Sequence, residues 1–148
     1  MRVLVSACLL GARCRYDGAS KPLCGMERLA ETFELVPVCP EQLGGLPTPR
    51  SPAERCGSRV LTRDGVDVTA QYERGAQEAL RLARLTGCAL ALLKERSPSC
   101  GCGRIYDGTH TGTLVDGRGV TAELLLRNGV PVYGESQLDA LLEWIKKV

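Results

Sequence analysis

Residues 88–93 read CALALL, an unbroken apolar run that begins directly after Gly87. A strand with one face in water alternates apolar and polar residues, whereas a strand covered on both faces is apolar throughout. The run therefore predicts an interior strand of a sheet that has helices on both sides. Before it, residues 67–86 carry apolar side chains at helical spacing, and Asp67 and Gly87 are typical of the start and the end of a helix.

Strand and helix patterns alternate along the rest of the chain. Further strands are expected at residues 3–7, 35–38, 58–62 and 130–133, further helices at residues 26–33, 121–127 and after 136, and a Pro-rich loop at residues 40–52. Such alternation is typical of an α/β fold with a mainly parallel sheet. No linker or low-complexity stretch interrupts the pattern, so we expect a single domain over residues 1–148.

The composition narrows the classes of function. The chain has 148 residues, of which 44% are hydrophobic and 24% charged, so it is not expected to be disordered. With 19 basic and 17 acidic residues, nucleic acid is a possible but not a favoured partner. No apolar run approaches the roughly 18 residues of a membrane span, and the N-terminal run falls short of the roughly 7–15 residues of a signal-peptide core. We therefore expect a cytoplasmic protein with reduced thiols and no membrane partner.

Eight cysteines are the unusual feature of the composition. Their spacing contains no C-x-x-C, which disfavours zinc-ribbon, thioredoxin-like and ferredoxin-like sites. Cys8, Cys39 and Cys100 each follow a predicted strand. Because the carboxyl ends of parallel strands meet in one crevice, we expect these three thiols to converge there. The alternative for each of them is the role of a small buried hydrophobe.

The other five cysteines have weaker claims to a function. Cys88 begins the apolar strand and is expected in the core, while Cys14, Cys24 and Cys56 are expected to be loop thiols. Cys102, which belongs to a C-x-C pair, is the best substitute ligand.

Three thiolates can bind three irons of a 4Fe–4S cluster and leave the fourth iron open as a soft Lewis acid. Glu41, two residues after Cys39, would place a carboxylate in the same crevice for acid–base chemistry, and Ser97, just before Cys100, a hydroxyl for hydrogen bonding. The alternatives are a solvated loop carboxylate and an ordinary turn serine. His110, the only histidine, either completes a Cys₃His zinc site or lies on the surface.

Five motifs follow one another in order. They are VSACLLG at residues 5–11, RYDG at 15–18, CPEQLGGLPTPR at 39–50, LKERSPSCG at 93–101 and IYDGT at 105–109. Together they span almost the whole chain, and in this order they resemble the thiouracil desulfidases, a family formerly called a domain of unknown function.

The resemblance implies a Rossmann-like, three-layer α/β domain with a 4Fe–4S cluster held by three cysteines. Carried over by position, the cluster ligands are Cys8, Cys39 and Cys100, the acid–base residue is Glu41, and the substrate-positioning residue is Ser97.

The function that the resemblance implies is that of an enzyme that removes sulfur from a thiolated nucleobase. A small molecule such as 2-thiouracil would give uracil and hydrogen sulfide by non-redox, Lewis-acid activation at the open iron. Glu41 would deprotonate the attacking water, and Ser97 would hold the ring or stabilise developing charge. The sequence departs from the family pattern at His110, where an aromatic residue is expected, and in the additional Cys56 and Cys102.

Two other functions stay open at this point. One is a structural zinc or iron–sulfur module that binds a partner, and the other is a persulfide-forming sulfurtransferase with Cys100 or Cys102 as its nucleophile. The natural thio-compound and the oligomeric state stay open as well, as does a ligand role for Cys102, Cys14 or His110.

Overall fold

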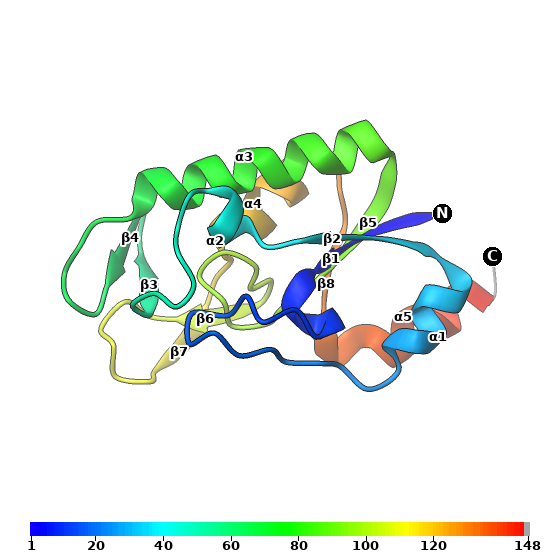
Figure 1. Cartoon of the computed structure of the whole chain (residues 1–148), viewed down its shortest axis with the longest axis horizontal. Coiled ribbons are helices and arrows are strands. Elements are labelled where there is room, and N and C mark those ends of the chain that lie inside the picture. Colours follow the sequence, from blue (N-terminus) through cyan, green and yellow to red (C-terminus); the bar gives the residue numbers. More distant parts are fainter. Residues whose placement is uncertain (147–148) are drawn as a thin grey trace.

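A four-stranded, fully parallel sheet forms the centre of the computed structural model, which describes residues 1–146 (Figure 1). Its strands, in spatial order, are β2 (Glu34–Val38), β1 (Arg2–Ser6), β5 (Cys88–Leu93) and β8 (Val132–Gly134). The apolar run at 88–93 is therefore an interior strand, as predicted. Residues 147 and 148, the last two of the expected domain, lie outside the described residues.

Helices cover both faces of this sheet, which confirms the predicted three-layer α/β class. The long helix α3 (Thr69–Thr86) and α4 (Val120–Arg127) lie on one face, and α1 (Met26–Thr32) and α5 (Leu138–Lys146) on the other (Figure 1). Successive strand residues point to opposite faces. Alternate residues of β1 and β5 thus pack against different helix pairs. The residues on the α3 side are Leu4, Ala91 and Leu93, and those on the α5 side are Val3, Val5, Leu90 and Leu92.

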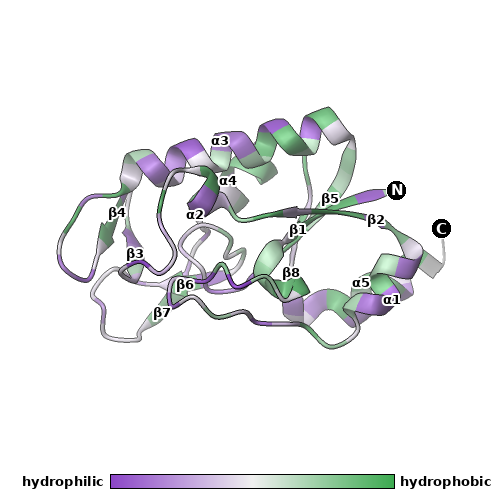
Figure 2. Ribbon diagram, in the orientation of Figure 1, coloured by the Kyte–Doolittle hydropathy of each residue, from purple (hydrophilic) through white to green (hydrophobic). Residues whose placement is uncertain are grey.

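The hydropathy of the elements follows these layers. In Figure 2, β5 is largely hydrophobic, whereas α3 alternates hydrophilic and hydrophobic residues along its turns. The side chains of α3 that are buried, such as Tyr72, Ala79 and Ala83, recur at helical spacing. None of the described helices is long and apolar enough to cross a membrane.

Two antiparallel hairpins lie beyond the carboxyl ends of the parallel strands (Figure 1). They are β3 (Ala53–Cys56) with β4 (Arg59–Thr62) and β6 (Arg104–Tyr106) with β7 (Leu114–Asp116). The extra strand expected at 58–62 is β4. The other three strands were not predicted, because strands of three or four residues carry too few alternating positions to show a period.

The Pro-rich segment predicted as a loop contains a single helical turn, α2 (Pro40–Leu43). Pro40 suits the first position of a helix, where its missing N–H is no loss. Glycines then let α2 lie directly on α3, because a Cβ on Gly75 would collide with the Pro40 carbonyl and a Cβ on Gly44 with the Gln71 carbonyl. This backbone contact fixes the turn that carries Cys39 and Glu41.

Candidate active site

A cavity of about 660 Å³ lies at the carboxyl edge of the sheet, and all three predicted thiols border it. Cys8 lies in the 3-10 turn after β1 (Ala7–Leu10), Cys39 directly after β2, and Cys100 in the loop after β5. The residues are far apart in the sequence and meet because three parallel strands end at the same edge. The expected convergence of the three thiols is therefore present in the fold.

These thiols lie close enough to influence one another. Burial raises the pKa of Cys8 to about 11 and that of Cys39 to about 12, and the neighbouring Glu41 charge adds to both shifts. The pKa of Cys100 is raised further, chiefly by burial, and Glu41, Cys8 and Cys39 contribute. Burial thus favours the protonated form of these thiols in the metal-free chain. A metal centre, in contrast, displaces the thiol protons when it binds.

The number of thiol donors bears on which metal centre the site could hold. Within residues 1–146, no three Cys, His, Asp or Glu side chains gather tightly enough to hold one metal ion. A structural zinc site needs four donors at about 2.0–2.3 Å from a single ion. Three thiols are one donor short of such a site, and three is the number that would hold three irons of a 4Fe–4S cluster and leave the fourth open.

A fourth thiol, that of Cys14, borders the same cavity and was predicted to be a loop thiol. Cys14 is buried, and burial is the main reason why its pKa is raised. Gly11 ends the 3-10 turn with φ +100° and turns the chain back toward the cavity. In the sequence, the available signal for this turn was Gly11, three residues after Cys8. The carbonyl oxygen of Cys14 accepts the Cys39 thiol at 3.7 Å.

The remaining cysteines lie elsewhere. The Sγ of Cys102 donates to the Val132 carbonyl at 3.3 Å and packs in the core beside α4, so this residue does not border the cavity. Cys88 is partly buried in the same core cluster, as expected, and Cys24 and Cys56 are exposed.

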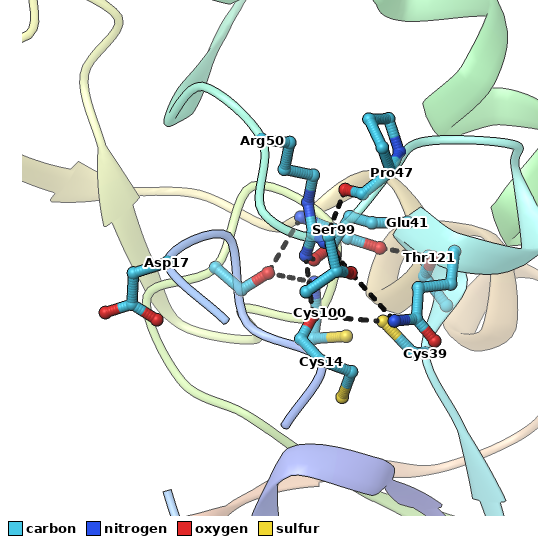
Figure 3. A network of polar contacts seen from close by, with 12 residues as sticks. Cys14, Asp17, Cys39, Glu41, Pro47, Arg50, Ser99, Cys100 and Thr121 are labelled. Atoms are coloured by element: carbon cyan, nitrogen blue, oxygen red, sulfur yellow. Dashed lines mark hydrogen bonds and ion pairs between the residues drawn. The ribbon is translucent and has the colours of Figure 1, made fainter. Parts of the chain in front are cut away.

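Glu41 faces the cavity from the first turn of α2 and is paired with Arg50 (Figure 3). The guanidinium Nη2 lies 2.6 Å from Glu41 Oε2, and the two side chains are only 6% and 15% exposed, Arg50 being the more buried. Burial raises the pKa of Glu41, while Arg50 and a hydrogen bond from Ser99 act in the opposite direction. Ser99 Oγ in turn lies 2.8 Å from the buried hydroxyl of Thr121.

Arg50 connects three segments around the cavity. Its Nη2 also donates to the Cys14 carbonyl at 3.0 Å, and its Nη1 donates to Thr48 Oγ1 at 3.1 Å and to the Pro47 carbonyl at 3.3 Å. The guanidinium is thus engaged by the protein itself. One side chain links the Cys14 loop to the turn that carries Glu41, as Figure 3 shows.

Ser97 organises the loop that carries Cys100. Its hydroxyl oxygen accepts the backbone N–H of Ser99 at 3.1 Å and that of Cys100 at 3.0 Å. Gly101 is needed next, because a Cβ there would lie 2.7 Å from the Ser97 carbonyl oxygen. The hydroxyl oxygen of Ser97 is used as an acceptor, so its hydrogen is left to donate, and the residue borders the cavity.

Fold and site together define an α/β protein with a thiol-lined cavity, bordered by a buried carboxylate, at the carboxyl edge of a parallel sheet. Residues 3–137 match the family model of 2-thiouracil desulfurase, and the chain belongs to that family. This confirms the resemblance seen in the motifs.

Two relatives extend over nearly the whole chain. A solved structure described as the 4Fe–4S-dependent thiouracil desulfidase TudS is 48% identical and superposes with a TM-score of 0.94, covering 99% of both chains. The protein YbbK of Bacillus subtilis (strain 168) is 41% identical over an alignment 150 positions long, gaps included, and the alignment covers 95% of this chain and 99% of YbbK.

Proposed function

We propose that this chain is a 4Fe–4S-dependent desulfidase that converts a thiolated base such as 2-thiouracil into uracil and hydrogen sulfide. The observation that carries the proposal is the meeting of three thiols, two buried and that of Cys39 partly buried, with the largely buried Glu41 carboxylate in one cavity. The relative TudS, by its description a 4Fe–4S-dependent thiouracil desulfidase, supports it. A single Rossmann-like domain over residues 1–148, a small-molecule partner and a cytoplasmic setting that keeps thiols reduced belong to the same proposal.

Cys8, Cys39 and Cys100 would hold the cluster through three of its irons. When bound, the cluster supplies a Lewis acid at the remaining iron, which suits the soft sulfur of a thiocarbonyl. The raised pKa values of the three thiols mean that they hold their protons in the metal-free chain. Binding of the cluster would release these protons. Cys14 lies beside these ligands and is not needed as a fourth one, because three ligands leave a position for substrate.

Glu41 is the base in this reaction. It takes a proton from a water molecule, and the water oxygen attacks the carbon that carries sulfur. A C–O bond forms and the C–S bond breaks with its electron pair on sulfur. Glu41 returns its proton to the departing sulfur, and the second proton of the water also ends there, so that C=S and H₂O become C=O and H₂S without any gain or loss of electrons. Arg50 holds Glu41 Oε2 at 2.6 Å, which fixes the carboxylate during the proton transfer.

Ser97 positions the substrate. Its oxygen already accepts two backbone N–H groups, so the direction in which its hydrogen points is constrained. The hydroxyl therefore donates to a polar atom of the thiolated ring, and that bond strengthens as charge develops during the attack.

The decisive experiment measures metal content and sulfide release after anaerobic reconstitution. We expect about four irons per chain and sulfide release from 2-thiouracil. Alanine at Cys8, Cys39 or Cys100 should abolish iron binding. Glu41→Gln should keep the iron and lower kcat by about 100-fold or more, because the base is removed.

Three results would contradict the proposal. They are full activity of Glu41→Gln, zinc in place of iron in the active protein, and sulfide transfer that survives complete metal removal. The last result would favour the persulfide mechanism instead.

A further inference from the structure

A second pair of facing ionisable side chains, His110 and Glu54, borders the cavity that holds the three thiols. His110 lies in the loop between β6 and β7, and Glu54 lies on β3. The imidazole Nδ1 is 3.6 Å from Glu54 Oε2, and the side chains are 18% and 12% exposed, respectively. The chemistry proposed above uses neither residue.

The backbone around His110 is held in an uncommon conformation. His110 has φ +59°, in the left-handed region that residues with a Cβ rarely adopt. Glu54 Oε1 accepts the N–H of Gly108 at 3.0 Å and that of His110 at 3.1 Å. Asp107 Oδ1 accepts the N–H of Thr109 at 2.9 Å and its hydroxyl at 2.6 Å. A conformation of this kind persists where surrounding bonds determine it, and such positions cluster at functional sites.

Glu54 thus has two tasks in this loop. One carboxylate oxygen fixes the backbone, and the other faces the imidazole Nδ1. A carboxylate beside one ring nitrogen fixes the orientation of a histidine and leaves the other nitrogen for a ligand. Within residues 1–146, Nε2 of His110 has no hydrogen-bond partner. It is therefore available to a molecule in the cavity.

We propose that His110, oriented by Glu54, is a specificity-determining residue that hydrogen-bonds through Nε2 to the polar edge of the thiopyrimidine. The proposal rests on the proposed function for the identity of the ligand. A thiopyrimidine carries N–H and C=O groups in addition to the thiocarbonyl, and with the Nδ1 hydrogen facing the Glu54 carboxylate, Nε2 accepts a hydrogen bond from a ring N–H. His110 binds the ring and takes no part in the attack on carbon, so its loss affects KM more than kcat.

Four variants test this role in cluster-loaded protein. His110→Phe keeps a ring and removes both nitrogens, and His110→Gln restores one polar group. Glu54→Gln keeps the oxygen that accepts the two backbone N–H groups and removes the charge beside Nδ1. Thr111→Ala is the matched control, because Thr111 is exposed on the same loop and does not border the cavity.

The readouts are KM and kcat for sulfide release from 2-thiouracil, and the Kd of the product uracil by calorimetry. His110→Phe should raise KM and the uracil Kd by about tenfold with kcat within about twofold, the effect of one lost hydrogen bond. Glu54→Gln should raise KM and the uracil Kd by about threefold. The KM and Kd of His110→Gln should lie between those of His110→Phe and those of wild type. Thr111→Ala should match wild type.

A His110→Phe protein with the KM and uracil Kd of wild type would overturn the inference. An equal rise of KM and Kd in Thr111→Ala would also overturn it, because the effect would then come from the loop and not from the imidazole ring. Wild-type protein that releases no sulfide would overturn the proposed function. Its uracil affinity, compared with that of His110→Phe, would still decide the role of His110. Wild-type protein that neither releases sulfide nor binds uracil would overturn both.

Discussion

Glu41 carries its charge into a cavity where burial disfavours ionisation, and Arg50 is the cation that compensates for it. A buried ion pair is costly to break, since the remaining partner is left as an uncompensated charge away from water. The guanidinium also holds the Cys14 carbonyl and Thr48, so its geometry matters in addition to its charge. At the scale of single residues, the stability of the site and the chemistry proposed for Glu41 therefore involve the same contact.

Replacing Arg50 separates charge from geometry. Arg50→Met should lower the free energy of unfolding by about 3 kcal/mol, because Glu41 is left buried without a cation. Arg50→Lys should cost about 1–2 kcal/mol, because the charge stays while the bonds to Cys14 and Thr48 are lost. Urea unfolding of the metal-free protein measures both values. Equal stabilities of the two variants would show that the charge on Arg50 contributes little.

At the scale of elements, the contact between α2 and α3 sets the position of Cys39 and Glu41. Gly→Ala inside a helix normally stabilises it by up to about 1 kcal/mol. In Gly75→Ala the new methyl group would meet the Pro40 carbonyl, so we expect destabilisation by about 2 kcal/mol and a lower iron content. Gln77→Ala, at an exposed position of α3, is the control and should be nearly neutral. A stabilised Gly75→Ala protein with full iron content would refute this account of the packing.

The start of α3 provides a pH-dependent prediction. Hydrogen bonds from the hydroxyl and the backbone N–H of Thr69 lower the pKa of Asp67. A lowered pKa in the folded state means that this carboxylate stabilises the fold above its usual pKa of about 3.9, and that the effect is lost as the pH falls through the lowered value. Asp67→Ala should therefore lower Tm by a few degrees at pH 7. The difference from wild type should narrow below about pH 4, which thermal melts across pH 3–7 would measure; a constant difference would contradict it.

At the scale of the whole molecule, the three thiols join the ends of β1, β2 and β5. A ligand that binds only the folded chain stabilises it by an amount that grows with the logarithm of free ligand concentration over Kd. Cluster loading should therefore raise Tm by at least about 5 °C, and removal of iron with a chelator should reverse the gain. Scanning calorimetry of the loaded and the metal-free protein checks this. Cys24→Ser, at an exposed thiol, should behave as wild type, and an unchanged Tm on loading would mean that the three strand ends are not joined by the cluster.

Much of the site follows from local pattern. The CALALL run indicates a strand covered on both faces, and its neighbours alternate with helices. Once the sheet is parallel, the residues after β1, β2 and β5 must meet at one edge, so Cys8, Cys39 and Cys100 converge for a topological reason. Glu41 then enters the cavity because it is two residues from Cys39.

Other features depend on tertiary structure. Cys14 reaches the cavity because the chain reverses at Gly11, and Arg50 reaches Glu41 because the segment after α2 folds back over it. The short strands β3, β6 and β7 are held by pairing with their partners, and that pairing places Glu54 beside His110. The sequence by itself determined the layers and the meeting of the three thiols. The reason is that hydrophobic periodicity is a local property, and in a parallel sheet the residues that follow the strands lie at one edge. Only the tertiary structure decided which loop residues surround those thiols, because contacts between distant segments are selected by the packing of the whole chain.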